Sequence, residues 1–278
     1  MVLHGDFHIH TNFCPHGSKD DMESYVVTAI NKGMKSISFT EHAPLPKAFQ
    51  DPTPEKDSAM KWEDIDAYFD EANRLKRLYE NKLQINVGFE VDYIVGFEGE
   101  TMEFLNKYGP IIEDAILSVH MLQAPNGEYA CVDFSADEFE RIIKLFGSVE
   151  QVYACYYDTV KQAVQSDLGT CKPMRIGHLT LIEKFSKLYP SKKDFREKIM
   201  ELLGLIKKKN LQLDINTAGL YKEYCGLTYP NPGIMQQAKE MSIPMVIGSD
   251  SHTSKHIGRG FELLPDHMEF VAPDNIRN

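Results

Sequence analysis

The sequence predicts an α/β fold with a mainly parallel sheet, and two observations lead to this class. Short apolar segments rich in β-branched residues alternate with longer segments whose apolar residues recur every three or four positions. The 278 residues contain neither an internal repeat nor a Gly/Ser-rich linker, so residues 1–278 are predicted to form one domain. Seven strand–helix units favour an α/β barrel lacking one strand over an open sheet.

Seven short apolar segments are the predicted strands: 3–10, 35–40, 84–89, 115–120, 174–178, 212–216 and 244–249. Helical spacing is clearest in residues 62–75 and 195–206. The connection over residues 43–60, rich in proline and charge, is longer than a plain strand-to-helix turn. It is either a surface excursion or a lid that sets specificity, and its position directly after Glu41 and His42 favours the lid.

Composition narrows the class of protein further. The formal net charge is −11, which argues against broad binding to nucleic acid. The five cysteines are scattered, odd in number and without a CxxC pair, so a disulfide framework is not expected. The N-terminus does not resemble a signal peptide, and no stretch of 18 apolar residues occurs. We therefore expect a cytoplasmic protein without membrane contact; nothing in the sequence indicates its oligomeric state.

The placement of the histidines is the main functional signal. Most predicted strands end in, or are directly followed by, a histidine or an acid, and His16 follows the first strand in its loop. In a parallel barrel these strand ends meet on the face where active sites lie. The side chains expected to converge there are His8, His10, His16, His42, Glu90, His120, His178, Asp250 and His252.

Neutral imidazoles and carboxylates are the ligands that Zn, Mn and Fe prefer. Nine such side chains are too many for one ion and suit two or three. A lone histidine is more often a hydrogen-bonded structural residue, but that explanation would have to hold seven times at strand ends. His4, His256 and His267 do not fit the pattern and are interpreted as structural or solvent-facing. Cys14, between two of the histidines, is not expected to be a ligand.

Six ordered motifs carry a resemblance to a known family: DFHIHTNFCPH, TEH, GFEVDY, SVH, RIGH and GSDSH. Together they resemble the PHP (polymerase and histidinol phosphatase) superfamily from Asp6 to about Gly260, in the order typical of its histidinol-phosphate phosphatase branch. The resemblance implies a distorted (β/α)7 TIM-like barrel and three divalent transition-metal ions, drawn from Zn, Fe or Mn. It also implies hydrolysis of a small phosphate monoester, L-histidinol phosphate, in histidine biosynthesis.

Transferred by motif, the ligands divide into three implied sites. The first holds His8, His10, Glu90 and Asp250, the second His16, His42 and His252, and the third Glu90 again, as a bridge, with His120 and His178. Asp6 and Glu41 adjoin ligands and are expected to orient imidazole N–H groups.

Phosphate hydrolysis needs charge neutralisation, a nucleophile and protonation of the leaving group. Two ions roughly 3.5–4 Å apart can bridge a water, and the resulting hydroxide can attack phosphorus in line. Asp250 and His252 are expected next to this nucleophile. Arg175, three residues before His178, and Arg259 are the phosphate-binding candidates, each with a surface ion pair as its alternative.

Asn216 and Thr217 follow the sixth strand and are expected to face the substrate, unless they merely cap a turn. Asp92 is expected either to contact a cationic group of the substrate or to orient a ligand.

Two alternatives stay open at this level. Another PHP activity, such as a nuclease or a protein-tyrosine phosphatase, would use the same centre, although a nuclease needs a basic or aromatic groove. A non-catalytic metal-binding protein is the alternative from another class, and the complete ligand set argues against it.

Overall fold

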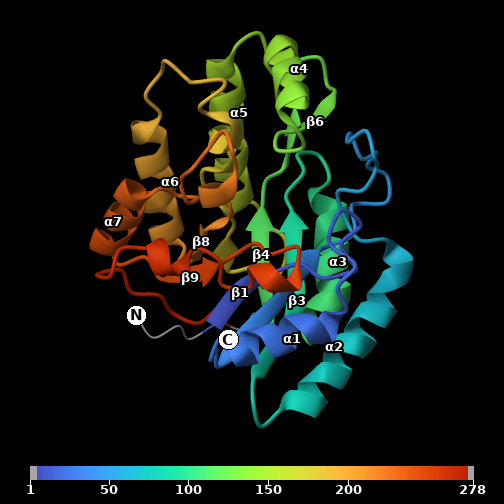
Figure 1. Ribbon diagram of the computed structural model, residues 1–278. Helices are drawn as coiled ribbons and strands as arrows, with labels where there is room; N and C mark the ends of the chain where they lie inside the picture. Colours follow the sequence, from blue (N-terminus) through green and yellow to red (C-terminus); the bar gives the residue numbers. More distant parts are fainter. Residues whose placement is uncertain (1–4, 275–278) are drawn as a thin grey trace.

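The structure, a computed structural model that describes residues 5–274, is built around one parallel sheet of seven strands (Figure 1). The strands follow the order β1 (Gly5–Ile9), β2 (Ser36–His42), β3 (Gln84–Asp92), β4 (Asp114–Ser118), β7 (Arg175–Ile176), β8 (Gln212–Asn216) and β9 (Met245–Gly248). Each pairs in parallel with its neighbours, as crossover helices between consecutive strands require.

The first and last strands approach each other just beyond their ends. Ile9 forms a parallel bridge with Ser251, and the His10 amide donates to the Ser251 carbonyl at 2.9 Å. This contact nearly closes the sheet and confirms the predicted seven-stranded barrel.

Helices cover the outside of the strands. They are α1 (Met22–Asn31), α2 (Ile65–Tyr79), α3 (Glu98–Tyr108), α4 (Ala136–Phe146), α5 (Val149–Gln165), α6 (Arg196–Lys208) and α7 (Pro232–Glu240). The short 3₁₀ turns are η1 (Trp62–Asp64), η2 (Gly109–Ile111), η3 (Leu181–Phe185), η4 (Ala218–Tyr221), η5 (Ser254–His256) and η6 (Phe261–Leu263). Among residues 5–274, no helix combines the length and apolar character needed to cross a membrane.

Local sequence explains where several helices begin. The Asp21 side chain accepts a hydrogen bond from the Ser24 amide at the start of α1, and Ser135 and Ser148 cap α4 and α5 in the same way. The apolar side of each helix then packs on the strands in one large core. This packing holds the strand ends, and hence the residues that follow them, in fixed positions.

The predicted strands agree with the observed ones to within a few residues. Residues 212–216 match β8, whereas β3 runs on to Asp92 because its buried residues continue beyond 89. Leu3 and His4, the start of the first predicted strand, lie outside the described residues.

One antiparallel hairpin was not predicted, because its strands are only three residues each: β5 (Met121–Gln123) and β6 (Tyr129–Cys131). In Figure 1, β6 and α4 lie beyond the arrow tips of β3 and β4. The loop after β6 thereby reaches the rim of the barrel's carboxyl end.

Gly248, at the end of β9, lies where a larger residue would not fit. A Cβ atom there would lie 2.2 Å from the Cβ of His8 on β1. The close approach of the two strands brings His8 toward Asp250, so this glycine helps to assemble the site.

Candidate metal centre

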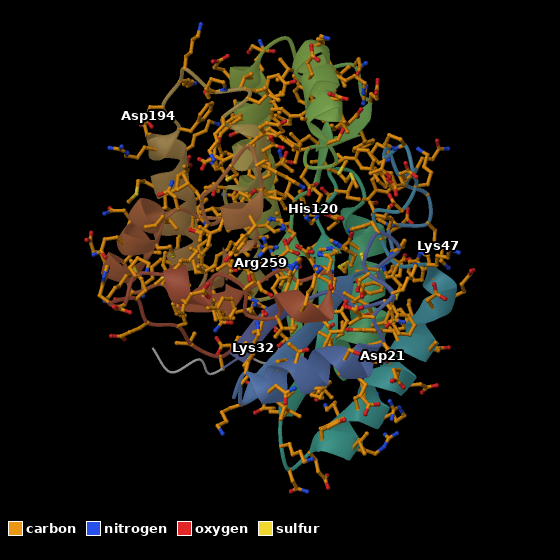
Figure 2. The ribbon with its side chains drawn as sticks, in the orientation of Figure 1. Asp21, Lys32, Lys47, His120, Asp194 and Arg259 are labelled. Carbon is orange, nitrogen blue, oxygen red and sulfur yellow. The ribbon has the colours of Figure 1, made fainter. Side chains whose placement is uncertain are left out.

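The nine predicted ligand residues converge at the carboxyl ends of the strands. Their nitrogen and oxygen atoms form four overlapping groups, in each of which the donor atoms lie within 4.8 Å of one another. The groups are His8, His10 and Glu90; His10, Asp250 and His252; Glu90, His120 and His178; and Cys14, His16, His42 and His252. In Figure 2, His120 lies near the centre of the view, above the strands. The arrangement follows the three implied sites closely, with His10 shared and Cys14 added.

Glu90 lies between the groups, and its two oxygens face different histidines. Oε1 is 2.9 Å from Nε2 of His178 and accepts from Ser118 Oγ at 2.6 Å. Oε2 is 3.4 Å from Nε2 of both His8 and His10. One carboxylate can therefore serve two neighbouring ion positions, as a bridging ligand must.

The tautomers of His16 and His252 show that a cation fits between them. Nδ1 of His16 donates to the Asp57 carbonyl at 2.8 Å, and Nδ1 of His252 donates to the Asp250 carbonyl at 3.1 Å. Both Nε2 atoms are then lone-pair acceptors, yet they face each other at 3.1 Å. Two facing acceptors repel unless a proton or a cation lies between them.

His8 and His10 lead to the same conclusion. Within residues 5–274, their buried Nε2 atoms have no hydrogen-bond partner, although both point toward a carboxylate oxygen. Buried polar atoms are rarely left unpaired, and an ion between nitrogen and oxygen would satisfy both. The residues present therefore fit a group of divalent ions.

The pKa values of the clustered residues show how their charges are balanced when no metal ion is bound. Burial raises the pKa of Glu90, but the nearby histidines more than offset it and hold that pKa well below its usual range. Burial lowers the pKa of His10 and His120, yet neighbouring carboxylates raise them to about 9 and about 10. The pKa of His42 is lowered instead, because burial and the charge of His10 both disfavour its protonated form. Without metal, protons on some imidazoles balance the buried carboxylates.

Three carboxylates orient the imidazole rings through Nδ1. Asp214 lies 3.1 Å from His8, Glu41 3.3 Å from His10 and Asp92 2.7 Å from His120. The orienting role predicted for Glu41 is confirmed, and Asp92 orients a ligand. Each contact leaves Nε2 free to bind metal.

The orienting role predicted for Asp6 is wrong. Its carboxylate accepts from the backbone amides of Ser249 and Gly258, at 2.9 and 2.7 Å, and from the Ser249 hydroxyl at 2.5 Å. It therefore fixes the backbone around the last motif. Asp214, which was not predicted, takes the role instead, and the only signal in the sequence is an acidic residue inside an apolar strand.

Asp250 has a backbone φ of +52°, a conformation that residues other than glycine seldom adopt. Asn216 supports it, because Nδ2 donates to Asp250 Oδ2 at 3.0 Å while Oδ1 accepts from the Ala218 amide at 2.9 Å. The strained backbone directs the Asp250 carboxylate toward His10 Nε2, 3.3 Å away.

The substrate contacts predicted for Asn216 and Thr217 are therefore not formed by this geometry. Both side chains are buried, and the Thr217 hydroxyl donates to the Arg259 carbonyl at 2.7 Å. These residues hold Asp250 and Arg259 in place, since their own polar groups are engaged within the protein.

Arg175 is likewise not placed to bind phosphate, contrary to the prediction. It is only 1% exposed, and its guanidinium donates to Asp114 at 2.7 Å, to the Phe7 carbonyl at 2.8 Å and to Asp214 at 3.3 Å. His178 lies three residues further on, beyond the end of β7, and extended chain advances about 3.3 Å per residue. Arg175 instead forms a buried ion pair beneath the centre and positions Asp214, which in turn orients His8.

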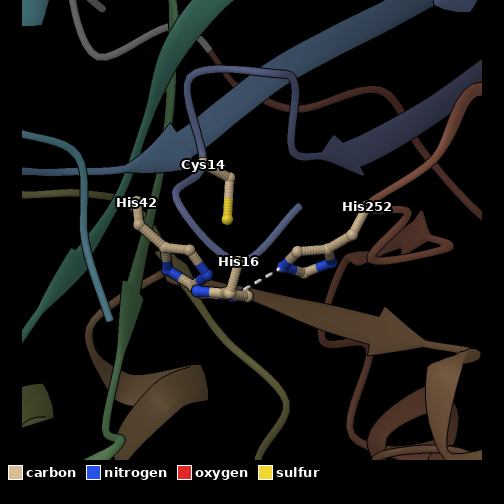
Figure 3. Close-up of side chains that lie close together, drawn as sticks. All are labelled: Cys14, His16, His42 and His252. Carbon is tan, nitrogen blue, oxygen red and sulfur yellow. Dashed lines mark hydrogen bonds between the residues drawn. The ribbon is translucent and has the colours of Figure 1, made fainter. Parts of the chain in front are cut away.

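Cys14 is an unexpected neighbour of the centre. Figure 3 shows its sulfur pointing toward the rings of His16, His42 and His252. Burial and the charge of Glu41 raise the pKa of the thiol, which opposes the thiolate form that binds metal. The three imidazoles thus remain the expected ligands of this group.

A cavity of about 400 Å³ opens above the metal ligands. Thr53, Asp57 and Ser58, from the long connection over residues 43–60, form part of its wall, as expected of a specificity loop. Lys184, Lys222 and Arg259 supply positive charge to the same cavity. The Arg259 guanidinium lies 3.4 Å from the centre of the Tyr221 ring, and Arg259 and His120, both labelled in Figure 2, line the cavity together.

A barrel with clustered imidazoles and a shared carboxylate beneath a cationic cavity defines a metal-dependent hydrolase centre. Comparison with known proteins agrees. Residues 6–218 match the PHP domain. This match covers most of the chain, which therefore belongs to the PHP family.

Individual relatives are consistent with this family. The chain is 44% identical over 259 residues to a histidinol-phosphatase of Bacillus subtilis, covering 92% of this chain and 96% of the relative. A solved structure from Listeria monocytogenes, provisionally assigned as a histidinol phosphatase, has a TM-score of 0.88 at 40% identity, with 93% and 98% coverage. Histidinol phosphate phosphatase from Lactococcus lactis, solved with Zn, L-histidinol and phosphate, shares the fold at 20% identity, with a TM-score of 0.68 and 99% and 98% coverage.

Proposed function

We propose that this chain hydrolyses L-histidinol phosphate to L-histidinol and phosphate. The similarity to the Bacillus subtilis histidinol-phosphatase, at 44% identity over nearly the whole of both chains, carries the choice of substrate. The converged imidazoles and carboxylates support the chemistry. A role in histidine biosynthesis in the cytoplasm, with residues 1–278 acting as one catalytic domain, is part of this proposal.

The metal centre is proposed to hold three divalent ions drawn from Zn, Fe and Mn. The ligand sets are His8, His10, Glu90 and Asp250; His16, His42 and His252; and Glu90, His120 and His178. When bound, such ions neutralise phosphate oxygens and lower the pKa of water toward neutrality. Hard and borderline nitrogen and oxygen ligands support these metals over soft ones.

The phosphate end of the substrate is proposed to face Arg259 and Lys222. Both line the cavity, and stacking on Tyr221 holds the Arg259 guanidinium in place. Desolvation by the surrounding protein lowers the pKa of Lys222 although the residue as a whole is exposed, and an incoming phosphate would stabilise its ammonium group. Arg259 can form two hydrogen bonds with one phosphate, whereas Lys222 offers a point charge.

The ammonium and imidazole end is proposed to face Asp133 and the loop over residues 43–60. Asp133 lines the cavity and pairs with Lys184 at 3.0 Å. Burial raises its pKa, but the charge of Lys184 more than offsets this, so the carboxylate stays ionised. A carboxylate in the wall of the cavity can select a substrate that carries positive charge at one end.

A comparison of phosphate monoesters tests the proposal. Metal-reconstituted protein is assayed with L-histidinol phosphate, a nucleoside monophosphate, a phosphotyrosine peptide and an aryl phosphate. We expect the highest kcat/KM for L-histidinol phosphate. A higher value for the phosphotyrosine peptide or the nucleotide would assign the centre to another PHP activity, and no turnover of any ester would contradict a hydrolase.

A further inference from the structure

A second cavity, of about 680 Å³, lies beside η3, away from the metal ligands. Residues three apart in a 3₁₀ turn share a face, so Leu181 and Lys184 face the metal-centre cavity. Glu183 and Ser186, on another face of the same segment, line the second cavity. This separation shows that the second cavity has its own set of polar and apolar groups.

One part of the wall of this cavity is aromatic. Tyr153 and Tyr157 of α5 and Phe195, just before α6, line it together with Ile199. The Phe195 ring lies 5.6 Å from each of the two tyrosine rings. Such a wall favours an apolar or aromatic body, and the faces of the rings also attract cations.

One acidic group that lines the cavity has no partner among the described residues. No hydrogen bond or ion pair engages the side chain of Glu183, which is half-buried, and desolvation by the surrounding protein raises its pKa to about 7. After burial, the charge of Glu183 also contributes to the raised pKa of the Tyr153 and Tyr157 phenols, which belong to residues of the same cavity wall. A partly desolvated carboxylate without a partner is costly, and a cationic ligand would satisfy it.

Positive charges of the protein do not fill this role. Lys193 and Arg196 line the cavity but are exposed, as is the acidic Asp194, which lies at the periphery in Figure 2. The Lys193 ammonium lies 5.4 Å from the centre of the Phe195 ring and forms no ion pair with Glu183 among residues 5–274. The carboxylate is therefore available to a cation from solution.

We propose that this cavity is a second ligand site, which binds a small organic amine with an apolar or aromatic body. The ammonium group pairs with Glu183, while the body packs against Tyr153 and Phe195. This inference goes beyond the proposed hydrolysis and does not depend on it.

A matched pair of ligands tests the site. Metal-loaded protein is saturated with inorganic phosphate, so that the metal-centre cavity is occupied, and titrated with 2-phenylethylamine or 2-phenylethanol in a calorimeter. The two probes share their shape and differ in charge. We expect the amine to bind at least about 10-fold more tightly, as a charge-assisted hydrogen bond requires. Equal affinities, or no binding of the amine at millimolar concentration, would overturn the proposal.

Variants then test whether Glu183 supplies the negative charge that binds the amine. Glu183→Gln should weaken the amine about 10- to 100-fold and leave the alcohol unchanged, whereas Glu197→Gln, an exposed carboxylate on α6, should change neither. Unchanged amine binding in Glu183→Gln would refute the site. Should that variant fail to fold, Phe195→Leu gives a second test, with an expected loss of several-fold for both probes; unchanged affinity for both would refute the site.

Turnover of L-histidinol phosphate by Glu183→Gln should stay near that of the unaltered chain, since Glu183 does not line the metal-centre cavity. A chain that binds the amine but does not hydrolyse the ester would contradict the proposed function only. A chain that hydrolyses the ester but does not bind the amine would contradict the second site only.

Discussion

Replacing Glu90 with glutamine removes one negative charge that faces two groups of ligands. The amide keeps the shape of the side chain, and each group keeps two imidazoles, His8 with His10 and His120 with His178. What is lost is a charged oxygen at 2.9 Å from His178 Nε2 and another at 3.4 Å from His8 and His10. The change should therefore affect two ion positions together.

The size of the effect follows from counting these losses. A charge-assisted interaction contributes about 1.5–3 kcal/mol, and two positions lose one each, so the loss is about 3–6 kcal/mol. At about 1.4 kcal/mol per tenfold, Glu90→Gln should lower metal occupancy or kcat/KM by roughly 10²- to 10⁴-fold.

Elemental analysis and steady-state kinetics on the same preparations provide the measurement. The unaltered chain should carry close to three transition-metal ions, and Glu90→Gln should lose those of the two groups that share the carboxylate. Glu41→Gln is the matched control, because His10 is the only ligand ring that this carboxylate contacts; its other bonds are to Thr11 and the His42 amide, and its loss should cost about 10- to 100-fold. Full metal content and normal turnover in Glu90→Gln would refute the bridging role, and one ion or fewer in active protein would refute the trinuclear centre.

Three further outcomes follow from the geometry. Arg175→Met should destabilise folding by about 3–5 kcal/mol in denaturant titrations, because it leaves buried carboxylates unpaired; unchanged stability would contradict this. Arg259→Ala should lower kcat/KM about 10- to 100-fold for both histidinol phosphate and an aryl phosphate, since both esters carry the phosphate group it contacts; a loss confined to one ester would place Arg259 elsewhere. In the metal-free chain, His10 and His120 have pKa values raised to about 9 and about 10, so they are protonated at pH 7 and metal binding must release protons. Metal affinity should therefore rise with pH up to about 9–10, and a metal-binding enthalpy independent of the buffer's ionisation enthalpy would contradict proton release.

In the metal-free chain, rising pH has the opposite effect on the stability of the fold: it lowers that stability. A histidine whose pKa is raised on folding stabilises the fold fully below about 6.5, its unfolded value, and this contribution is lost as pH rises through the folded value. Metal-free protein should therefore lose thermal stability between about pH 6.5 and 10, whereas metal-loaded protein should not. Melting temperatures of chelated and reconstituted samples across this range provide the comparison.

Much of the centre could be predicted because the ligands follow strands in the sequence. A parallel barrel brings the carboxyl ends of its strands to one face, so residues such as His42 and Glu90 must lie near each other once the strands are recognised. Burial and β-branched patterning identify the strands without any tertiary information. The hydrogen-bonded partners of the ligands have no such rule. Asp214 and Asp6 are both acidic residues on buried strands, and only the packing shows which one reaches an imidazole.

By itself, the sequence determined the parallel barrel, the order of its strands along the chain and the set of imidazoles and carboxylates at their ends, because periodicity and strand-end position are local properties. The tertiary structure decided what depends on depth and direction inside the barrel. Arg175 and Arg259 are both arginines near a ligand motif, but the first is buried and paired with Asp114 and Asp214, whereas the second lines the cavity. A charged side chain can bind substrate only where it reaches the cavity, and whether it does so depends on strands that are distant in sequence.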